Sequence, residues 1–268
     1  VTLLNPLGDE RSVMRTSLLP GLLRAVARAR RHGERDAALF AVGSLFLPSP
    51  DGEGLPEERL AFAAVVAGDR HPWLSKPAPV DVWDAKGIAQ GFVRRLVRRE
   101  AAVRVASADG PPVLHPRGAA WIEVEGHRVG CLGPLHPDAG DAFDLGEVPV
   151  VVIDLDLQAI GALGTPPVRY ATLPRFPASA RDLAVVVVDS VAAGDVERAV
   201  REAAGDLGDH VALFDRFVGG AVPPGHASLA LHVVYRAPDR TLTDAEVDSR
   251  HGLVVEAVRK RFGATLRQ

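Results

Sequence analysis

The sequence predicts two α+β domains in tandem, and three observations support this. The chain has 268 residues, enough for two domains of ordinary size. Its last third opens with a β-branched run at 183–188, after which the periodicity indicates helix, strand, strand, helix and strand. Between the halves, 161–174 (GALGTPPVRYATLP) is rich in glycine and proline, as linkers are. We therefore expect domains over 1–165 and 174–268, with a linker at 166–173.

The first half is expected to form antiparallel strands with helices against one face. A helix begins near Pro20 and ends at His32-Gly33, with leucines recurring at helical spacing. A second helix is expected to be N-capped by Asp84. Its expected apolar stripe is Ile88, Phe92, Leu96 and Val97. The expected strands are 38–47, 60–67, 102–106, 119–124, 128–133 and 148–155, with a short helix near 137–143.

The second half predicts a βαββαβ module. Its expected strands are 183–188, 211–218, 228–235 and 264–267, and its first helix is 195–204. The second helix starts with a capping box, Thr243 to Glu246, and ends at Gly263. Two helices on one face of four strands leave the other face free to bind a partner.

Composition excludes several classes of function. The formal net charge of −3 provides no overall basic field for nucleic acid. The single cysteine, Cys131, excludes an internal disulfide and a multi-cysteine metal site, and fits a reducing cytoplasm. No apolar run approaches the roughly 20 residues that span a bilayer, so we expect no membrane partner.

Few residues suggest catalysis, and each has an alternative explanation. His115, His127, His136 and Cys131 could bind a metal, or lie in turns and strand ends, because their spacing matches no common site. Asp154 and Asp156 could be paired carboxylates, or alternate outward on a strand. Asp84 and Lys86 could bind a ligand, or be a cap and a solvated lysine. Glycine-rich phosphate loops are absent from the sequence. We expect no catalytic residue, no metal ligand and no autonomous active site.

A series of short motifs follows a fixed order along nearly the whole chain. In the first half they are NP at 5–6, MRTSLLPGLL at 14–23, LFAVG at 39–43, VWDAKG at 82–87, LHP at 114–116 and GCLGPLHP at 130–137. In the second half they are RFP at 175–177, RDLA at 181–184, LFD at 213–215, SLA at 228–230, RTLTD at 240–244 and LR at 266–267. Together they resemble the C-terminal part of the bacterial phenylalanine–tRNA ligase β subunit. That resemblance implies a class II synthetase catalytic-like domain followed by a ferredoxin-like anticodon-binding domain.

The sequence departs from this family pattern at a few positions. Ala41 and Asp154 stand where the family usually has Glu, and Ala85 stands where it usually has Leu. Arg117 and Gly118 are in swapped order. The family's N-terminal tRNA-binding, editing and magnesium-holding modules have no counterpart here. The resemblance therefore implies a fragment of a longer gene product or a truncated open reading frame.

The resemblance also implies a function shared with other chains. The family's α2β2 holoenzyme attaches phenylalanine to tRNA(Phe) in the cytoplasm, using ATP and Mg²⁺. We expect neither cofactor on this chain. The first domain is expected to pack on the α subunit through an apolar surface that includes the helix at 18–26. Two alternatives remain: a free-standing RNA-binding scaffold, and a small-molecule-binding ferredoxin-like regulator without ligase activity.

The expected RNA surface lies at one end of the second domain. It is formed by Arg175, Phe176 and Arg181 near the first strand, and by Arg236 and Arg240 after the third, because these strands are neighbours in a βαββαβ sheet. Guanidinium planes and an aromatic ring suit unstacked anticodon bases. Residues 174–268 hold 12 Lys and Arg against 13 Asp and Glu, so local placement must matter. Alternatively, Arg181 pairs with Asp182 or a helix end, and Phe176 fills the core under the linker.

Overall fold

The computed structural model describes residues 1–8, 12–49, 54–107, 109–170 and 172–267. Contacts divide the chain into two compact units, Val1–Val168 and Arg169–Gln268, each with its own hydrophobic core. Ala171, within the expected linker, lies outside the described residues.

The first domain is built on a six-stranded antiparallel sheet, in the order β1-β2-β8-β7-β6-β5. The strands are β1 (Ala37–Leu47), β2 (Glu57–Ala67), β5 (Ala101–Val105), β6 (Ala120–Val124), β7 (His127–Pro134) and β8 (Val150–Asp156). The helices are α1 (Leu19–Arg31), α2 (Val82–Val97), α3 (Pro137–Ala142) and α4 (Leu157–Ala162). A small ribbon pairs β3 (Asp69–Arg70) with β4 (Ala78–Pro79).

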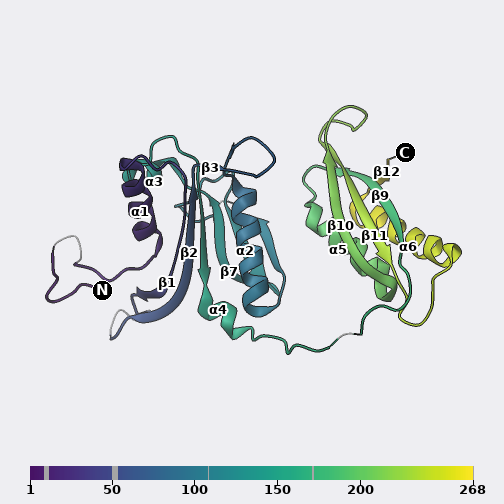
Figure 1. The fold of residues 1–268 in the computed structure, drawn as a ribbon, viewed down its shortest axis with the longest axis horizontal. Coiled ribbons are helices and arrows are strands. Elements are labelled where there is room, and N and C mark those ends of the chain that lie inside the picture. The colour runs from purple at the N-terminus through teal and green to yellow at the C-terminus, as the bar shows by residue number, and fades with distance from the viewer. Residues whose placement is uncertain (9–11, 50–53, 108, 171, 268) are drawn as a thin grey trace. The chain divides into compact units, whose positions relative to one another are not determined.

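Helices cover both faces of this sheet, so the expectation of helices on one face was wrong. Figure 1 shows α1 on one side of the sheet and α2 on the other. The physical reason lies in β2 and β8, whose apolar residues are nearly continuous rather than alternating. Consecutive apolar residues point to opposite faces of a strand, so both faces need a cover.

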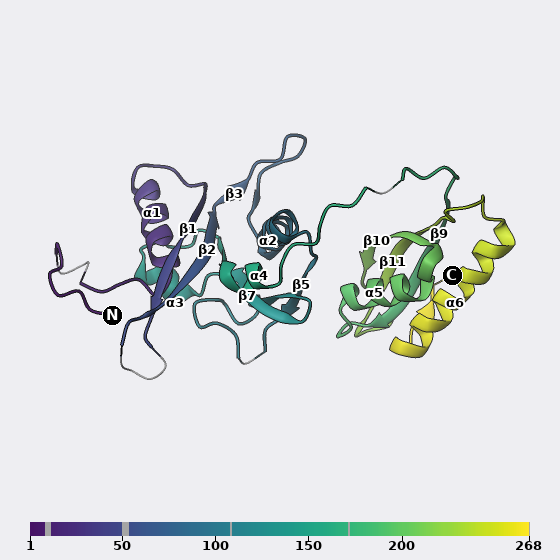
Figure 2. The same ribbon diagram turned by 90° about the horizontal axis from the view of Figure 1, so that it is seen from below.

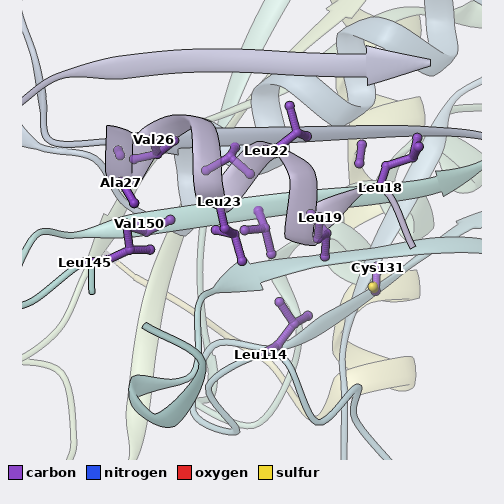
Figure 3. Packing of buried hydrophobic residues seen from close by; sticks show 14 of the residues in the cluster. Leu18, Leu19, Leu22, Leu23, Val26, Ala27, Leu114, Cys131, Leu145 and Val150 are labelled. Atoms are coloured by element: carbon purple, nitrogen blue, oxygen red, sulfur yellow. The ribbon is translucent and has the colours of Figure 1, made fainter. Parts of the chain in front are cut away.

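The apolar face of α1 is buried in the domain's own core. Leu19, Leu22, Leu23 and Val26 pack over the sheet, where Figure 3 shows them near Val150. The leucine-rich stretch at 18–26 is therefore not a free docking surface, contrary to expectation. Leu23 is 1% exposed, and truncation to alanine at such a site costs about 2–5 kcal/mol.

Two details of α2 differ from expectation. Its N-cap is Asp81, whose side chain accepts from the backbone N–H of Trp83; Asp84 is the third helical residue and completes a capping box. The buried stripe is Ala85, Ala89, Val93 and Val97. Of the expected stripe, only Val97 lies in this buried set. Small inner residues let the helix pack closely on the sheet, which leaves its larger apolar residues towards solvent.

The second domain is a four-stranded antiparallel sheet, in the order β10-β11-β9-β12. Its elements are β9 (Ser179–Val188), α5 (Ala193–Ala204), a 3-10 turn (Gly205–Leu207), β10 (Gly208–Phe217), β11 (His226–Tyr235), α6 (Asp244–Phe262) and β12 (Thr265–Leu266). Both helices pack on one face (Figures 1 and 2). Thr243 and Glu246 form the predicted capping box, and Gly263 ends α6 at φ 63°. The predicted α+β class and βαββαβ order are confirmed.

Candidate RNA-binding surface

The sheet register brings the predicted RNA-binding residues to one end of the second domain. β9 and β11 are hydrogen-bonded neighbours, with Ser179 opposite Tyr235. The residues just before β9 therefore meet the residues just after β11. Arg236 makes this link directly, because its Nη1 donates to the carbonyl oxygen of Phe176 at 2.9 Å. We call the surface formed by Arg175, Phe176, Arg181, Arg236 and Arg240 the arginine end.

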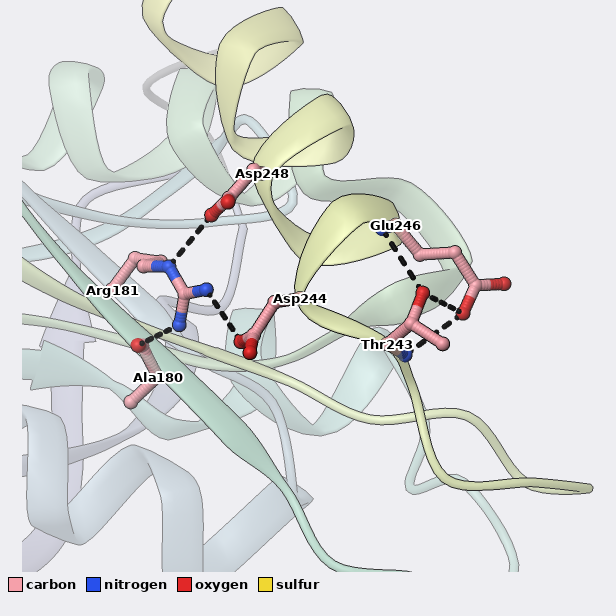
Figure 4. A network of polar contacts seen from close by, with 6 residues as sticks. All are labelled: Ala180, Arg181, Thr243, Asp244, Glu246 and Asp248. Carbon is pink, nitrogen blue, oxygen red and sulfur yellow. Dashed lines mark hydrogen bonds and ion pairs between the residues drawn. The ribbon is translucent and has the colours of Figure 1, made fainter.

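Arg181 is held by two carboxylates of α6. Figure 4 shows Nε donating to Asp248 and Nη2 donating to Asp244, each at 2.9 Å, while Nη1 donates to the carbonyl oxygen of Ala180. The hydrogen bond that Arg181 donates to Asp244, followed by the one it donates to Asp248, raises the pKa of the Arg181 guanidinium. The partner is therefore the start of a helix, as the alternative explanation proposed, and not the adjacent Asp182.

Arg240 and Arg236 also have carboxylate partners. Arg240 bonds Glu246 at 2.7 Å and Asp239 at 3.2 Å. The hydrogen bond from Arg240, with those from Thr243 in the capping box, lowers the pKa of Glu246 to about 2. Arg236 bonds Asp209 at 3.1 Å.

Arg175 and Phe176 lie just before β9 and differ from the other three residues. Arg175 is exposed, and no ion pair holds it within the described residues. Phe176 is half-buried and lies outside the hydrophobic core cluster of the domain. Arg175 is therefore the arginine of this surface that is exposed and has no ion pair within the described residues.

Sequence reasoning missed the carboxylates of the arginine end. They are Asp209, Asp239, Asp244, Glu246 and Asp248. One signal was available: residues of one parity in β9 face the helices, and Arg181 shares the parity of Leu183 and Val185, which are buried. A phosphate that binds here must replace a carboxylate on the guanidinium, and the exchange keeps the donors satisfied.

The uncovered face of the sheet presents a second set of groups. Asp182 Oδ1 and His232 Nδ1 lie 2.6 Å apart, from neighbouring strands β9 and β11. Arg267 lies over the ring of Phe217, 4.9 Å from its centroid. Between them the strands present small residues, such as Ala184 opposite Ala230. Sequence reasoning predicted the free face and did not name these residues.

The outer side of α2 carries apolar side chains around a shallow hollow in the first domain. Ile88 and Leu96 are 41% and 45% exposed and line a shallow hollow of about 590 Å³ together with Phe92. Trp83 lies at the start of the same helix, with the ammonium of Lys86 5.2 Å from its ring.

The residues considered for metal binding do not form a cluster. The rings of His115 and His136 stack at 6.2 Å, and Cys131 is buried in the core. Burial, with the charge of Asp154, raises the pKa of the Cys131 thiol to about 12. Within the described ranges no three His, Cys, Asp or Glu side chains are grouped to hold a metal ion. Asp156 caps α4 by accepting from the N–H of Ala159 at 2.8 Å.

None of the helices in the described part of the chain has the length and hydrophobicity needed to span a bilayer.

Two family models match the chain in tandem. Residues 1–157 match the phenylalanyl tRNA synthetase beta chain CLM domain, and residues 174–267 match the ferredoxin-fold anticodon binding domain. A pyrrolysyl-tRNA synthetase from Desulfitobacterium hafniense aligns over 59% of this chain and 52% of its own, at 11% identity and a TM-score of 0.42, which is too low to support an argument.

Curated relatives align over the whole chain. The phenylalanine–tRNA ligase beta subunits of Moorella thermoacetica, Anaeromyxobacter dehalogenans and Bacillus cereus are 41%, 40% and 37% identical to it. The chain spans about a third of their length, 33% in each case, while 100% of this chain is aligned. The resemblance read from the motifs is confirmed, and the chain belongs to the phenylalanyl-tRNA synthetase beta chain family.

Proposed function

We propose that this chain is the C-terminal part of a ligase β subunit and contributes assembly and tRNA positioning to the holoenzyme. The observation that supports this is the tandem match of the two family models, in the order of the two folded units. The proposed holoenzyme attaches phenylalanine to tRNA(Phe) at the expense of ATP, with Mg²⁺, in the cytoplasm. The described residues offer no clustered metal ligands, so we assign ATP and Mg²⁺ to other parts of the holoenzyme.

The second domain is the proposed site for the anticodon region of tRNA(Phe). Arg175 and Phe176 provide an accessible guanidinium and ring, the chemistry that stacks on unpaired bases. Arg181, Arg236 and Arg240 provide forks that match phosphate as well as carboxylate. Because each already has a carboxylate partner, binding is an exchange of anions, and its net gain is smaller than for a free arginine.

The first domain is the proposed contact for the α subunit, in an α2β2 assembly. The exposed apolar residues of α2 support this, since a row of such residues is typical of a protein interface. Substitution of Ile88 and Leu96 by Glu should abolish association with the α subunit in analytical ultracentrifugation and leave the circular dichroism spectrum unchanged. Association at unchanged affinity would place the interface elsewhere.

The RNA role is tested with a fluorescent anticodon stem-loop of tRNA(Phe) and the 268-residue chain. The double variant Arg181→Ala, Arg240→Ala should weaken binding and lower the salt slope by less than one phosphate contact for each arginine, because each arginine already has a carboxylate partner. The matched control is Arg201→Ala, Arg261→Ala, which removes two exposed, ion-paired arginines from the helices. If both variants bind equally and remain folded, Arg181 and Arg240 do not bind RNA. The RNA site would then lie elsewhere, for example on the uncovered sheet face.

A reconstituted ligase separates this proposal from the two alternatives. The chain alone should show no phenylalanine-dependent pyrophosphate exchange. In the holoenzyme, the Arg181→Ala, Arg240→Ala variant should raise the KM for tRNA(Phe) more than it lowers kcat, because the surface binds RNA away from the chemistry. A free-standing scaffold or regulator would leave aminoacylation unchanged.

A further inference from the structure

The solvent face of α1 carries a row of arginines. Residues 19–35 hold five arginines and one carboxylate, Glu34. Arg24, Arg28 and Arg31 follow at i, i+4 and i+7, which places them on one side of the helix. All three are exposed, and the leucines on the opposite side are buried in the core (Figure 3). The row is therefore fixed on a rigid element.

Two of these three arginines lack, within the described residues, the carboxylate partners seen at the arginine end. Arg24 and Arg28 contact no carboxylate of the described chain. Arg31 pairs with Asp144 at 3.5 Å, with the two side chains 68% and 80% exposed, an arrangement worth at most about 1 kcal/mol.

The helix dipole explains only part of the row. Cations are favourable in the last turn of a helix, where Arg28 and Arg31 lie. Arg24 lies earlier, where this effect has fallen off. Favourable interaction with the helix dipole therefore does not account for all the positive charge in residues 19–35. The whole chain, by contrast, has a net charge of −3.

The spacing fits a run of phosphates. From Arg24 to Arg31 the helix rises about 10 Å at 1.5 Å per residue, so the three guanidiniums lie along one rigid line and can contact phosphates along a single backbone strand. Arginine forks bind phosphate oxygens in a bidentate way. We propose that Arg24, Arg28 and Arg31 form a second RNA site, which binds the phosphate backbone of an RNA duplex. This inference rests on the proposed function in that the partner is RNA.

The site is tested by anisotropy of a labelled 12-base-pair RNA duplex with the full 268-residue chain. The variant Arg24→Gln, Arg28→Gln removes two arginines that have no ion pair to lose within the described residues, so its circular dichroism spectrum should match that of the wild type and its melting temperature should fall by no more than about 3 °C, from the lost interaction of Arg28 with the helix dipole. Its affinity should fall about tenfold or more at 50 mM salt, and the salt slope should fall by about 2. The variant Arg24→Lys, Arg28→Lys should keep the slope, because it keeps the charge.

Control variants make the outcome decisive. Arg117→Gln, Arg169→Gln removes the same charge from two exposed arginines outside α1 and should leave duplex binding unchanged. An equal loss in both pairs, or no loss in either, would overturn the proposal. Binding of an acidic peptide in place of the duplex would also overturn it. The anticodon stem-loop should depend on Arg181 and Arg240 and not on Arg24, so failure of one site is distinguishable from failure of the other.

Discussion

If Arg181 binds RNA, removal of the carboxylates that hold it should strengthen binding. Asp244 and Asp248 lie 2.9 Å from the guanidinium, and a phosphate on Arg181 would lie close to both (Figure 4). Two charges about 6 Å apart in water repel by about 0.7 kcal/mol, a factor of about three for each carboxylate. The double variant Asp244→Asn, Asp248→Asn should therefore bind the anticodon stem-loop up to about tenfold more tightly at low salt.

The same substitutions should cost little stability. The side chains of Arg181, Asp244 and Asp248 are 30%, 87% and 64% exposed, and exposed pairs contribute about 0.2–1 kcal/mol each. We expect a loss of about 1 kcal/mol, or roughly 4–8 °C in Tm for a domain of this size. Tm is measured by calorimetry on the same samples used for anisotropy.

The two measurements separate the two roles of Arg181. A lower Tm with tighter RNA binding supports the exchange of carboxylate for phosphate. A lower Tm with unchanged RNA binding would show that the network in Figure 4 only anchors α6 to β9, and would refute the RNA role of Arg181. The variant Asp195→Asn, in the first turn of α5, provides a control for loss of a helix-terminal carboxylate.

Three further predictions concern stability and accessibility. Cys131, whose pKa burial raises to about 12, should react with a thiol reagent at pH 8 only after unfolding; fast labelling of the native chain would contradict its burial. Burial and the charge of Asp156 raise the pKa of Asp154, so the folded state holds this proton more tightly than the unfolded state. The free energy of unfolding therefore falls as pH rises above about 3.8, the ordinary pKa of an aspartate. Asp154→Asn should raise Tm at pH 7 and flatten this pH dependence, and an unchanged Tm would contradict the raised pKa. Limited proteolysis should cut first at 167–173, and early cuts inside 185–204 would argue against two separately folding units.

The proteolysis range follows from contacts that the sequence did not reveal. Arg99 donates to the carbonyl oxygens of Leu163 and Gly164, and Arg98 donates to that of Pro166. These bonds hold the start of the glycine- and proline-rich stretch against the first domain. Composition predicted a linker from this stretch, and could not predict where side chains anchor it.

Element order was predictable from sequence because periodicity and caps are local signals. The capping box at Thr243 and the stop at Gly263 were read correctly for that reason. The buried face of α2 was predicted wrongly, because Ile88 and Leu96 form an apolar stripe as regular as the buried stripe of alanines and valines. A helix with two apolar sides does not reveal from sequence which side meets the sheet. The choice depends on how closely the helix must approach.

The arginine end shows the same limit for a site. Neighbouring strands bring Arg236 to Phe176, as strand topology predicts, because topology fixes which strand ends meet. Partner choice was not predictable, since Asp244 and Asp248 are about 65 residues from Arg181 in sequence. Only the parity of Arg181 with Leu183 indicated that its side chain faces α6.

The two groups of arginines should respond differently to salt, and this difference follows from their partners. At the arginine end three of five residues are already paired, so RNA releases few additional counterions and mainly exchanges anions. On α1, Arg24 and Arg28 have no carboxylate partner in the described chain, so each phosphate they bind displaces salt counterions directly. Raising salt should therefore weaken duplex binding steeply and anticodon-loop binding gently. Stacking on Phe176 involves no charge, so it makes the salt dependence of anticodon-loop binding weaker still.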